Sequence, residues 1–218
     1  MKGKSGDKRF VGYVSRVVSE LSGLVGDKSI RAYTRADALR FRDLLVARGV
    51  AQATVKRNFE CVRAIWNFTA TENAIDAVNP FSNINYGNGA KPVRRLPIPP
   101  EQLSSIQAEC RRKDDEMRWL IGVLSDSGMR LAEAIGLTKN DISLDSATLI
   151  IWIKAHPWRP LKTQNSQRCV PAVGSTLWGI KRAYESSQSK FLFPRYCSAD
   201  GNKSDYASNG LNKWLQPM

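Results

Sequence analysis

Two short segments of the chain carry charged side chains at spacings that could hold a phosphate. The first segment is residues 125–145. Glycine often ends helices, so Gly128 is expected to end one helix, and Arg130 stands where the next helix would begin. Glu133 follows three residues later on the same helical face, where it could hold or orient the arginine. A guanidinium fixed in this way offers parallel donors to two phosphate oxygens. In an arbitrary protein, the same pair would usually be a surface ion pair at a helix start.

The second segment, residues 161–173, lies between two predicted strands. Lys162 would lie at or near the turn of the resulting β-hairpin, with Arg168 on the returning strand. An ammonium group on a hairpin tip is compact and could reach a leaving oxygen as a proton donor. The ordinary alternative is a lysine in a turn exposed to solvent. Lys162 therefore indicates a catalytic role only in combination with the first segment.

The elements around these segments are predicted to be mostly helical, with a small sheet. Pro100 and Glu101 are typical of a first helical turn, because proline is tolerated there. The expected elements after that helix are a helix at 117–124, a short helix at 130–135, a turn at 139–141, strands at 148–154 and 168–170, a helix at 175–186, a polar loop at 198–204 and the start of a helix within 209–214.

The first part of the chain is predicted to be helical. Apolar residues predict a helix over 10–21, and a second helix should begin after Thr34, where Asp37 completes an imperfect capping box. Gly49 stands where the C-terminal cap of that helix is expected.

A third helix, from Thr54 onward, has the clearest periodicity. Lys56 and Arg63 lie on a second face of this helix, either as solvated charges or as groups that follow a phosphate backbone. Its buried stripe is expected to consist of Val55, Phe59, Val62, Trp66 and Thr69.

Residues 86–97 are rich in glycine and proline and are predicted to be an interdomain linker. Its three cations, Lys91, Arg94 and Arg95, would let the linker lie along a phosphate backbone. The expected organisation is a helical domain at 1–85, this linker, and a second domain at 98–218.

Composition favours a basic, globular protein whose partner is a polyanion. The 218 residues include 33 Lys and Arg against 20 Asp and Glu, a formal net charge of +13. The excess is concentrated in residues 1–95, with 17 cations against 8 acids (net +9), while residues 96–218 have 16 against 12 (net +4). The longest apolar run, 149–153, is far shorter than the roughly 20 residues that span a bilayer, so no membrane segment is expected.

The residues that bind metals are sparse. His156 is the single histidine, and the four cysteines form no C-x-x-C pair, so we expect reduced thiols and no metal site.

Taken together, the two segments resemble the tyrosine recombinases, the phage-type integrases. The family pattern G-[ML]-R-[LVI]-[SA]-E-x-x-x-L is matched by Gly128, Met129, Arg130, Leu131, Ala132, Glu133 and Leu137. The hairpin pattern K-[TG]-x-x-S-x-R-x-[VL]-P is matched by Lys162, Thr163, Ser166, Arg168, Val170 and Pro171. Residues 34–68 are similar to the helical core-binding domain of integrases, so the resemblance covers the chain from about residue 30 onward.

The resemblance implies a mainly α fold with a small β-sheet: a helical, SAM-like core-binding domain followed by a partial α+β catalytic domain. It implies site-specific DNA recombination or integration without metal or cofactor. Arg130 would clamp the scissile phosphate, Glu133 would orient Arg130, and Lys162 would act as general acid. The expected DNA-binding residues are Lys56, Arg57, Arg63, Lys91, Arg94, Arg95, Lys139 and Arg168. The implied partner is double-stranded DNA, bound as a tetramer by a full-length protein, in the bacterial cytoplasm at the nucleoid.

The sequence departs from the family at the residues that complete the reaction. In the family, the lysine is followed by H-x-x-R and then by the nucleophilic tyrosine. The literal match at residues 156–159 precedes Lys162 and contains a proline, so we reject it. Tyr184, Tyr196 and Tyr206 all precede the place of that box, so we expect no nucleophile in this chain and interpret it as truncated.

Two alternatives remain open. A binding-only protein, such as a truncated integrase remnant, would occupy DNA sites without chemistry. A basic helical scaffold for RNA or an acidic protein is disfavoured, because the chain lacks the aromatic and glycine signatures of common RNA modules. The coding sequence after Met218 would separate a fragment of an active enzyme from a remnant.

Overall fold

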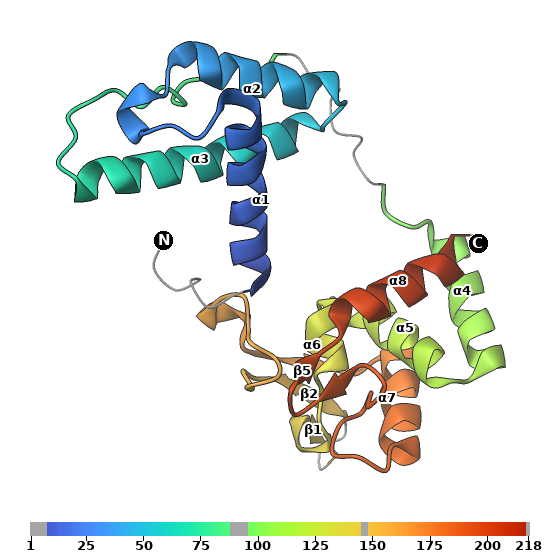
Figure 1. Cartoon of the computed structure of the whole chain (residues 1–218). Coiled ribbons are helices and arrows are strands. Elements are labelled where there is room, and N and C mark those ends of the chain that lie inside the picture. Colours follow the sequence, from blue (N-terminus) through green and yellow to red (C-terminus); the bar gives the residue numbers. More distant parts are fainter. Residues whose placement is uncertain (1–7, 88–95, 145–147, 217–218) are drawn as a thin grey trace. The chain divides into compact units, whose positions relative to one another are not determined.

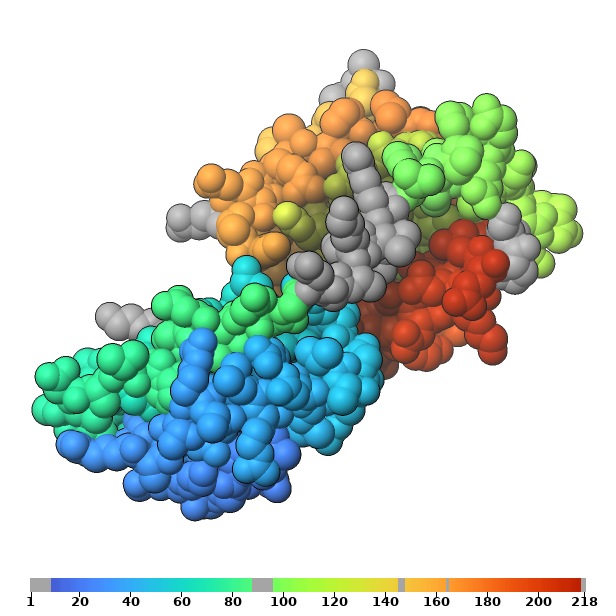
Figure 2. All heavy atoms as spheres, turned by 90° about the horizontal axis from the view of Figure 1, so that it is seen from above, coloured from blue at the N-terminus to red at the C-terminus, as the bar shows by residue number. Residues whose placement is uncertain are grey.

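The computed structural model describes residues 8–87, 96–144 and 148–216. The chain divides into two compact units, Met1–Arg95 and Leu96–Met218. They are coloured from blue to green and from green to red, respectively (Figure 1, Figure 2). Lys91, Arg94 and Arg95, expected to contact DNA, lie outside the described residues. Every helix within the described ranges is too short or too polar to span a bilayer.

The described part of unit 1 is helical, as the periodicity predicts. Its elements are α1 (Lys8–Val25), the 3-10 turn η1 (Ile30–Ala32), α2 (Arg35–Ala47) and α3 (Gln52–Glu72). The capping box at the start of α2 forms: the Thr34 hydroxyl accepts from the Asp37 backbone N–H at 3.2 Å, and the Asp37 carboxylate accepts from the Thr34 N–H at 2.9 Å. Gly49 follows α2 with φ +70°, a conformation that favours glycine.

The core of unit 1 forms where α1 and α2 pack on α3. Val55, Phe59, Val62 and Trp66 of the expected stripe are buried, whereas Thr69 is half-buried and Ala70 completes the stripe. The rings of Phe41 and Phe59 meet with centroids 5.5 Å apart, which joins α2 to α3.

Unit 2 combines helices with two small sheets. Its helices are α4 (Pro100–Lys113), α5 (Glu116–Ser127), α6 (Leu131–Ile135), α7 (Gly174–Ser186) and α8 (Ser204–Leu215), with 3-10 turns η2 (Lys139–Asp141) and η3 (Gln164–Ser166). Its strands are β1 (Ile142–Ser143), β2 (Ile150–Ile153), β3 (Arg168–Pro171), β4 (Cys197–Ser198) and β5 (Gly201–Asn202).

The larger sheet is antiparallel in the order β1-β2-β3, with Ile153 opposite Arg168 and Ile151 opposite Val170. Lys162 therefore lies in the β2–β3 connection, as expected, but that connection runs over residues 154–167 and is not a tight turn. The expectation of a polar loop at 198–204 is wrong in part, because β4 and β5 pair there as a short hairpin and α8 already begins at Ser204.

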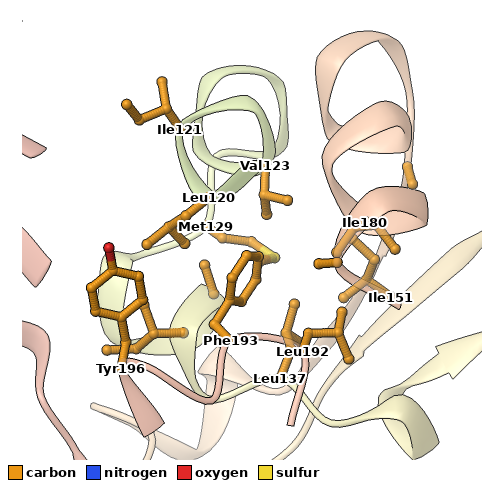
Figure 3. Close-up of a cluster of buried hydrophobic side chains, with 14 of the residues drawn as sticks. Leu120, Ile121, Val123, Met129, Leu137, Ile151, Ile180, Leu192, Phe193 and Tyr196 are labelled. Carbon is orange, nitrogen blue, oxygen red and sulfur yellow. The ribbon is translucent and has the colours of Figure 1, made fainter. Parts of the chain in front are cut away.

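The core of unit 2 lies between α5, α7 and the sheet (Figure 3). Close packing of α5 on α7 depends on Gly122 and Gly179: a Cβ at Gly179 would collide with the Trp119 carbonyl oxygen, and one at Gly122 would lie 2.9 Å from the Trp178 ring. The residues that close this core and are labelled in Figure 3 are Leu120, Ile121, Val123, Met129, Leu137, Ile151, Ile180, Leu192, Phe193 and Tyr196.

Candidate functional site

Arg130 stands at a rigid corner between two helices. Helix α5 ends at Ser127, and Gly128 reverses the chain with φ +62°. The Met129 N–H donates to the Ser127 hydroxyl at 3.2 Å, and α6 begins directly after Arg130. Arg130 is thus the N-cap of α6 and not part of its first turn, so its pairing with Glu133 is a capping interaction.

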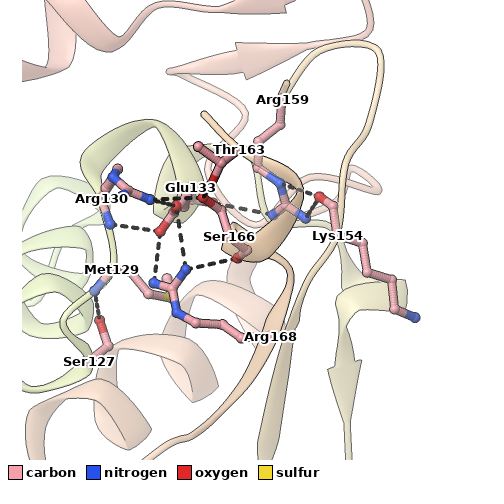
Figure 4. Close-up of polar contacts among 9 residues, drawn as sticks. All are labelled: Ser127, Met129, Arg130, Glu133, Lys154, Arg159, Thr163, Ser166 and Arg168. Atoms are coloured by element: carbon pink, nitrogen blue, oxygen red, sulfur yellow. Dashed lines mark hydrogen bonds and ion pairs between the residues drawn. The ribbon is translucent and has the colours of Figure 1, made fainter. Parts of the chain in front are cut away.

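Glu133 is a buried carboxylate shared by two arginines (Figure 4). Its Oε1 accepts from Arg130 Nη1 at 2.7 Å, and its Oε2 accepts from the Arg130 backbone N–H at 2.9 Å. Arg168 on β3 donates from Nη2 to Oε2, also at 2.9 Å. The Glu133 side chain is 5% exposed, against 55% for Arg130 and 34% for Arg168. One buried anion therefore holds two guanidinium groups that both reach the surface.

Burial alone would raise the pKa of Glu133, because it removes water from the carboxylate. Hydrogen bonds from Arg168 and from the backbone and side chain of Arg130 outweigh that effect, so the pKa of Glu133 lies below its ordinary value. The carboxylate stays charged at neutral pH and remains available to both arginines.

Ser166 fastens the Lys162 loop to these arginines (Figure 4). Its hydroxyl accepts from Arg130 Nη1 at 3.4 Å and shares a hydrogen bond with the Thr163 hydroxyl at 3.0 Å. Its carbonyl oxygen accepts from Arg168 Nη1 at 3.0 Å. Lys162 directly precedes Thr163 and is exposed, as is Arg130, so neither cation is covered by apolar packing.

Arg159 lies beneath this site and is 1% exposed. Its guanidinium donates to the Glu133 carbonyl oxygen at 3.2 Å and to the Lys154 carbonyl oxygen at 2.8 and 3.2 Å (Figure 4). It pairs with the buried Asp141 at 3.4 Å, and His156 Nε2 contacts the same carboxylate at 3.0 Å. Burial lowers the pKa of Arg159, and the charge of Asp141 opposes that shift.

Residues 156–159 are thus a structural motif, in which Arg159 binds the Glu133 carbonyl oxygen and Asp141. The sequence analysis, which rejects these residues as a catalytic box, does not predict that role. The signal that could have suggested it is weak: an arginine within a Trp- and Pro-rich connection, with an acid at 141.

The three tyrosines of the described part of unit 2, Tyr184, Tyr196 and Tyr206, differ in their surroundings. Tyr196 is buried, which raises its pKa, and its hydroxyl has no hydrogen-bond partner in the described structure. The Tyr206 hydroxyl accepts from Arg195 at 3.2 Å, and the Tyr184 ring lies under the ammonium of Lys139 at 5.0 Å. The Tyr206 hydroxyl and the Tyr184 ring thus have other partners, and within the described residues no hydrogen bond joins any of the three tyrosines to Arg130 or Glu133.

The remaining predicted DNA-binding residues of unit 1 lie on α3. Lys56 and Arg57 are exposed, and the Arg57 guanidinium stacks 4.6 Å from the centre of the Tyr13 ring. Arg63 is half-buried, and its carbonyl oxygen accepts from the Asn79 side chain at 3.3 Å. The structure therefore brings Arg130, Glu133 and Arg168 together in unit 2. Lys56, Arg57 and Arg63 lie on α3 of unit 1.

Solved structures with this architecture are known. The Tn1549 transposon integrase (residues 82–397) in complex with circular intermediate DNA matches 98% of this chain and 73% of its own length, with TM-score 0.73 and 17% identity. A lambda integrase tetramer bound to a Holliday junction matches 98% of this chain and 59% of its own length, with TM-score 0.74 and 10% identity. The chain has the tyrosine recombinase fold.

The fold class predicted from the two motifs is thereby confirmed. At these identities the likeness establishes the fold, and the activity has to be argued from the site. No protein-family model and no curated protein sequence matches the chain. Within this tyrosine recombinase fold, Arg130 lies at the α5–α6 corner and Lys162 in the β2–β3 connection.

Proposed function

We propose that this chain is a DNA recombination or integration protein of the tyrosine recombinase type, which binds duplex DNA and holds a backbone phosphate at Arg130. The observation that carries the proposal is the Glu133 carboxylate, which holds two half-exposed guanidiniums side by side. Such a pair suits a phosphodiester, because its preorganised donors can face the oxygens on which negative charge develops.

In the reaction implied by the resemblance, a deprotonated tyrosine oxygen attacks the phosphorus and forms a 3′-phosphotyrosyl bond as the bond to the 5′-oxygen breaks. Arg130 would stabilise the charge on the phosphoryl oxygens, with Glu133 as its positioning residue and Arg168 as a second cation. Lys162 would give its proton to the departing 5′-oxygen, a general-acid contribution of typically 10²–10⁴-fold. The Thr163–Ser166–Arg130 contacts support this role, because they tie the Lys162 loop to the proposed phosphate site.

We propose that these 218 residues bind DNA without cleaving it, because none of Tyr184, Tyr196 and Tyr206 forms a hydrogen bond with Arg130, Glu133 or Arg168 in the described part of unit 2. Incubation with a nicked suicide substrate should leave no covalent protein–DNA adduct on a denaturing gel. The positive control on the same gel is the covalent adduct that an active tyrosine recombinase forms with its own nicked suicide substrate. A stable adduct that maps to Tyr184, Tyr196 or Tyr206 would refute this part of the proposal.

Duplex binding should depend steeply on salt, because cations that contact phosphates release condensed counterions. If Lys56, Arg57, Arg63, Arg130, Lys162 and Arg168 each neutralise one phosphate, affinity should fall about 10³-fold between about 50 and about 200 mM salt. Fluorescence anisotropy with a labelled duplex of arbitrary sequence measures this slope. Arg130→Ala removes one of these six contacts, so it should lower the slope by about 0.9 and leave most of the salt dependence in place. An affinity that stays flat over this salt range would contradict the proposal.

The solved integrases bear on the partner and the assembly. One is described in complex with circular intermediate DNA, and another as a tetramer on a Holliday junction. We propose the same class of partner, duplex DNA, for this chain, and assembly into a tetramer on DNA for a protein that also carries the nucleophile.

A further inference from the structure

We infer that a cavity in unit 1 binds a small, uncharged, mainly apolar molecule that carries one hydrogen-bond acceptor, such as a ketone or ester oxygen. The walls of the cavity come from α1, from α3, from the segment around η1 and from Phe81. The inference goes beyond the proposed function, because none of the lining residues is among those proposed to contact phosphates.

The cavity has the volume and the walls of a small-ligand site. Its volume is about 260 Å³. A cavity of about 150 Å³ lined by Leu, Ile and Phe is enough to hold benzene, so this one has room for an aromatic ring with a short side chain. Leu21, Val62 and Phe81 contribute buried apolar walls, and the lining also includes Val18, which is 40% exposed. The cavity is therefore apolar inside and reaches the surface beside α1.

Trp66 gives this apolar cavity an unused hydrogen-bond donor. The residue lines the cavity and is only 7% exposed. Its indole Nε1–H is buried and has no hydrogen-bond partner within the described structure. A buried polar group without a partner is costly, and most such groups in folded proteins are paired. An acceptor oxygen of a bound molecule would supply the partner. Because Nε1 is shielded from solvent, that oxygen has to enter the inner part of the cavity, and the apolar body of the ligand fills the rest.

The charged group in the cavity wall, the Lys28 ammonium, is already neutralised. It donates to both carboxylate oxygens of the buried Asp37, at 2.9 and 3.0 Å. A second anion in the cavity would meet Asp37 as well as Lys28, and it would lose its water without gaining a free cation. An uncharged ligand has no such penalty. The pairing of Lys28 therefore favours a neutral molecule over a carboxylate or a phosphate.

The test uses three probes of equal size that differ in polarity. Acetophenone carries a ketone oxygen, cumene has a methyl group in its place, and benzoate is charged. The readout is the indole N–H nuclear magnetic resonance signal of Trp66 in the whole chain, assigned by its loss in Trp66→Phe. Acetophenone should move this signal downfield, because the N–H gains an acceptor, with a Kd below about 1 mM. Cumene should bind without the downfield shift, and benzoate should leave the signal in place.

Trp66→Phe keeps an aromatic wall and removes the donor. It should lower the affinity for acetophenone about three- to tenfold relative to the affinity for cumene, which is the usual net contribution of one hydrogen bond. Effects of the smaller ring that are common to both probes cancel in this ratio. A ratio equal to that of the wild type would show that the indole N–H takes no part in binding, and the inference would be overturned.

Val18→Phe tests the cavity itself, because a larger side chain in its wall fills the space. Binding of both acetophenone and cumene should be lost, with an unchanged far-UV circular dichroism spectrum. Val11→Phe is the matched control, since Val11 lies on the same helix, is 45% exposed and does not line the cavity. This control should bind both probes as the wild type does. Wild-type binding by Val18→Phe would place the probes elsewhere and contradict the inference.

Other occupants would also be revealed by these measurements. A benzoate affinity equal to that of acetophenone would assign the cavity to an anion. A dimer in sedimentation velocity that acetophenone dissociates and Val18→Phe abolishes would assign it to a second copy of the chain. Either result would overturn the inference. Neither involves duplex DNA, so the proposed function is tested separately.

Discussion

Replacing Arg159 by alanine should lower the unfolding free energy of unit 2 by about 3–5 kcal/mol, the usual cost of removing one partner of a buried ion pair. The substitution leaves the buried Asp141 carboxylate without its cation and removes the donors of the Glu133 and Lys154 carbonyl oxygens. It also empties the space beside Gly136, where the Arg159 side chain packs so closely that an added Cβ would lie 2.7 Å from it. Urea unfolding of the whole chain, with unit 2 followed by hydrogen exchange, measures the loss.

Arg112→Ala is the control in the same unit, because Arg112 is an exposed partner of Glu109. It should change stability far less. The double variant Asp141→Asn/Arg159→Met should lose less stability than the sum of the losses of the two single variants. It removes both charges of the pair, so neither is left buried without its partner. A loss below about 1 kcal/mol for Arg159→Ala would contradict the buried-pair account.

Replacing Glu133 by glutamine should lower stability at neutral pH by about 2 kcal/mol, because charge-assisted hydrogen bonds to Arg130 and Arg168 are exchanged for weaker ones. The loss is smaller than for Arg159 because both partner guanidiniums are partly in water. The pKa of Glu133 is below its ordinary value of 4.5 in the folded protein, so the charged carboxylate favours the folded state. Its stabilising contribution is complete above that ordinary value and is lost as the pH falls below it.

The stability gap between the wild type and Glu133→Gln should therefore be constant near neutral pH and shrink as the pH falls below 4.5. The difference in unfolding free energy between the two proteins is the readout. Asp37 and Asp114 also have lowered pKa values, so their protonation in acid destabilises both proteins equally. Urea midpoints at a series of pH values measure it. A gap that widens in acid would show that the carboxylate does not stabilise the folded protein.

Elements whose signals lie within a few residues were predictable. The Thr34 cap, the Gly128 helix end and the α3 stripe depend on residues three or four positions apart, so local chemistry decides them. The pairing of Arg130 with Glu133 belongs to this class, although its geometry is that of a cap.

The short β4–β5 hairpin had no such signal. Two-residue strands are too short to show alternation, and residues 198–204 are polar, so a loop was the natural expectation. The hairpin is held by distant contacts, since the Asn202 side chain donates to the Trp158 carbonyl oxygen at 2.9 Å.

By itself the sequence determined most of the helices, the strands β2 and β3, the two motif cations and the excess of positive charge on residues 1–95. Only the tertiary structure decided that Glu133 also holds Arg168, that Arg159 is buried on Asp141, and that Arg16 and Arg57 share the Tyr13 ring. The physical reason is separation along the chain. A cap is formed by its own neighbours, whereas an ion pair between residues 35 positions apart exists only once packing has brought β3 beside α6.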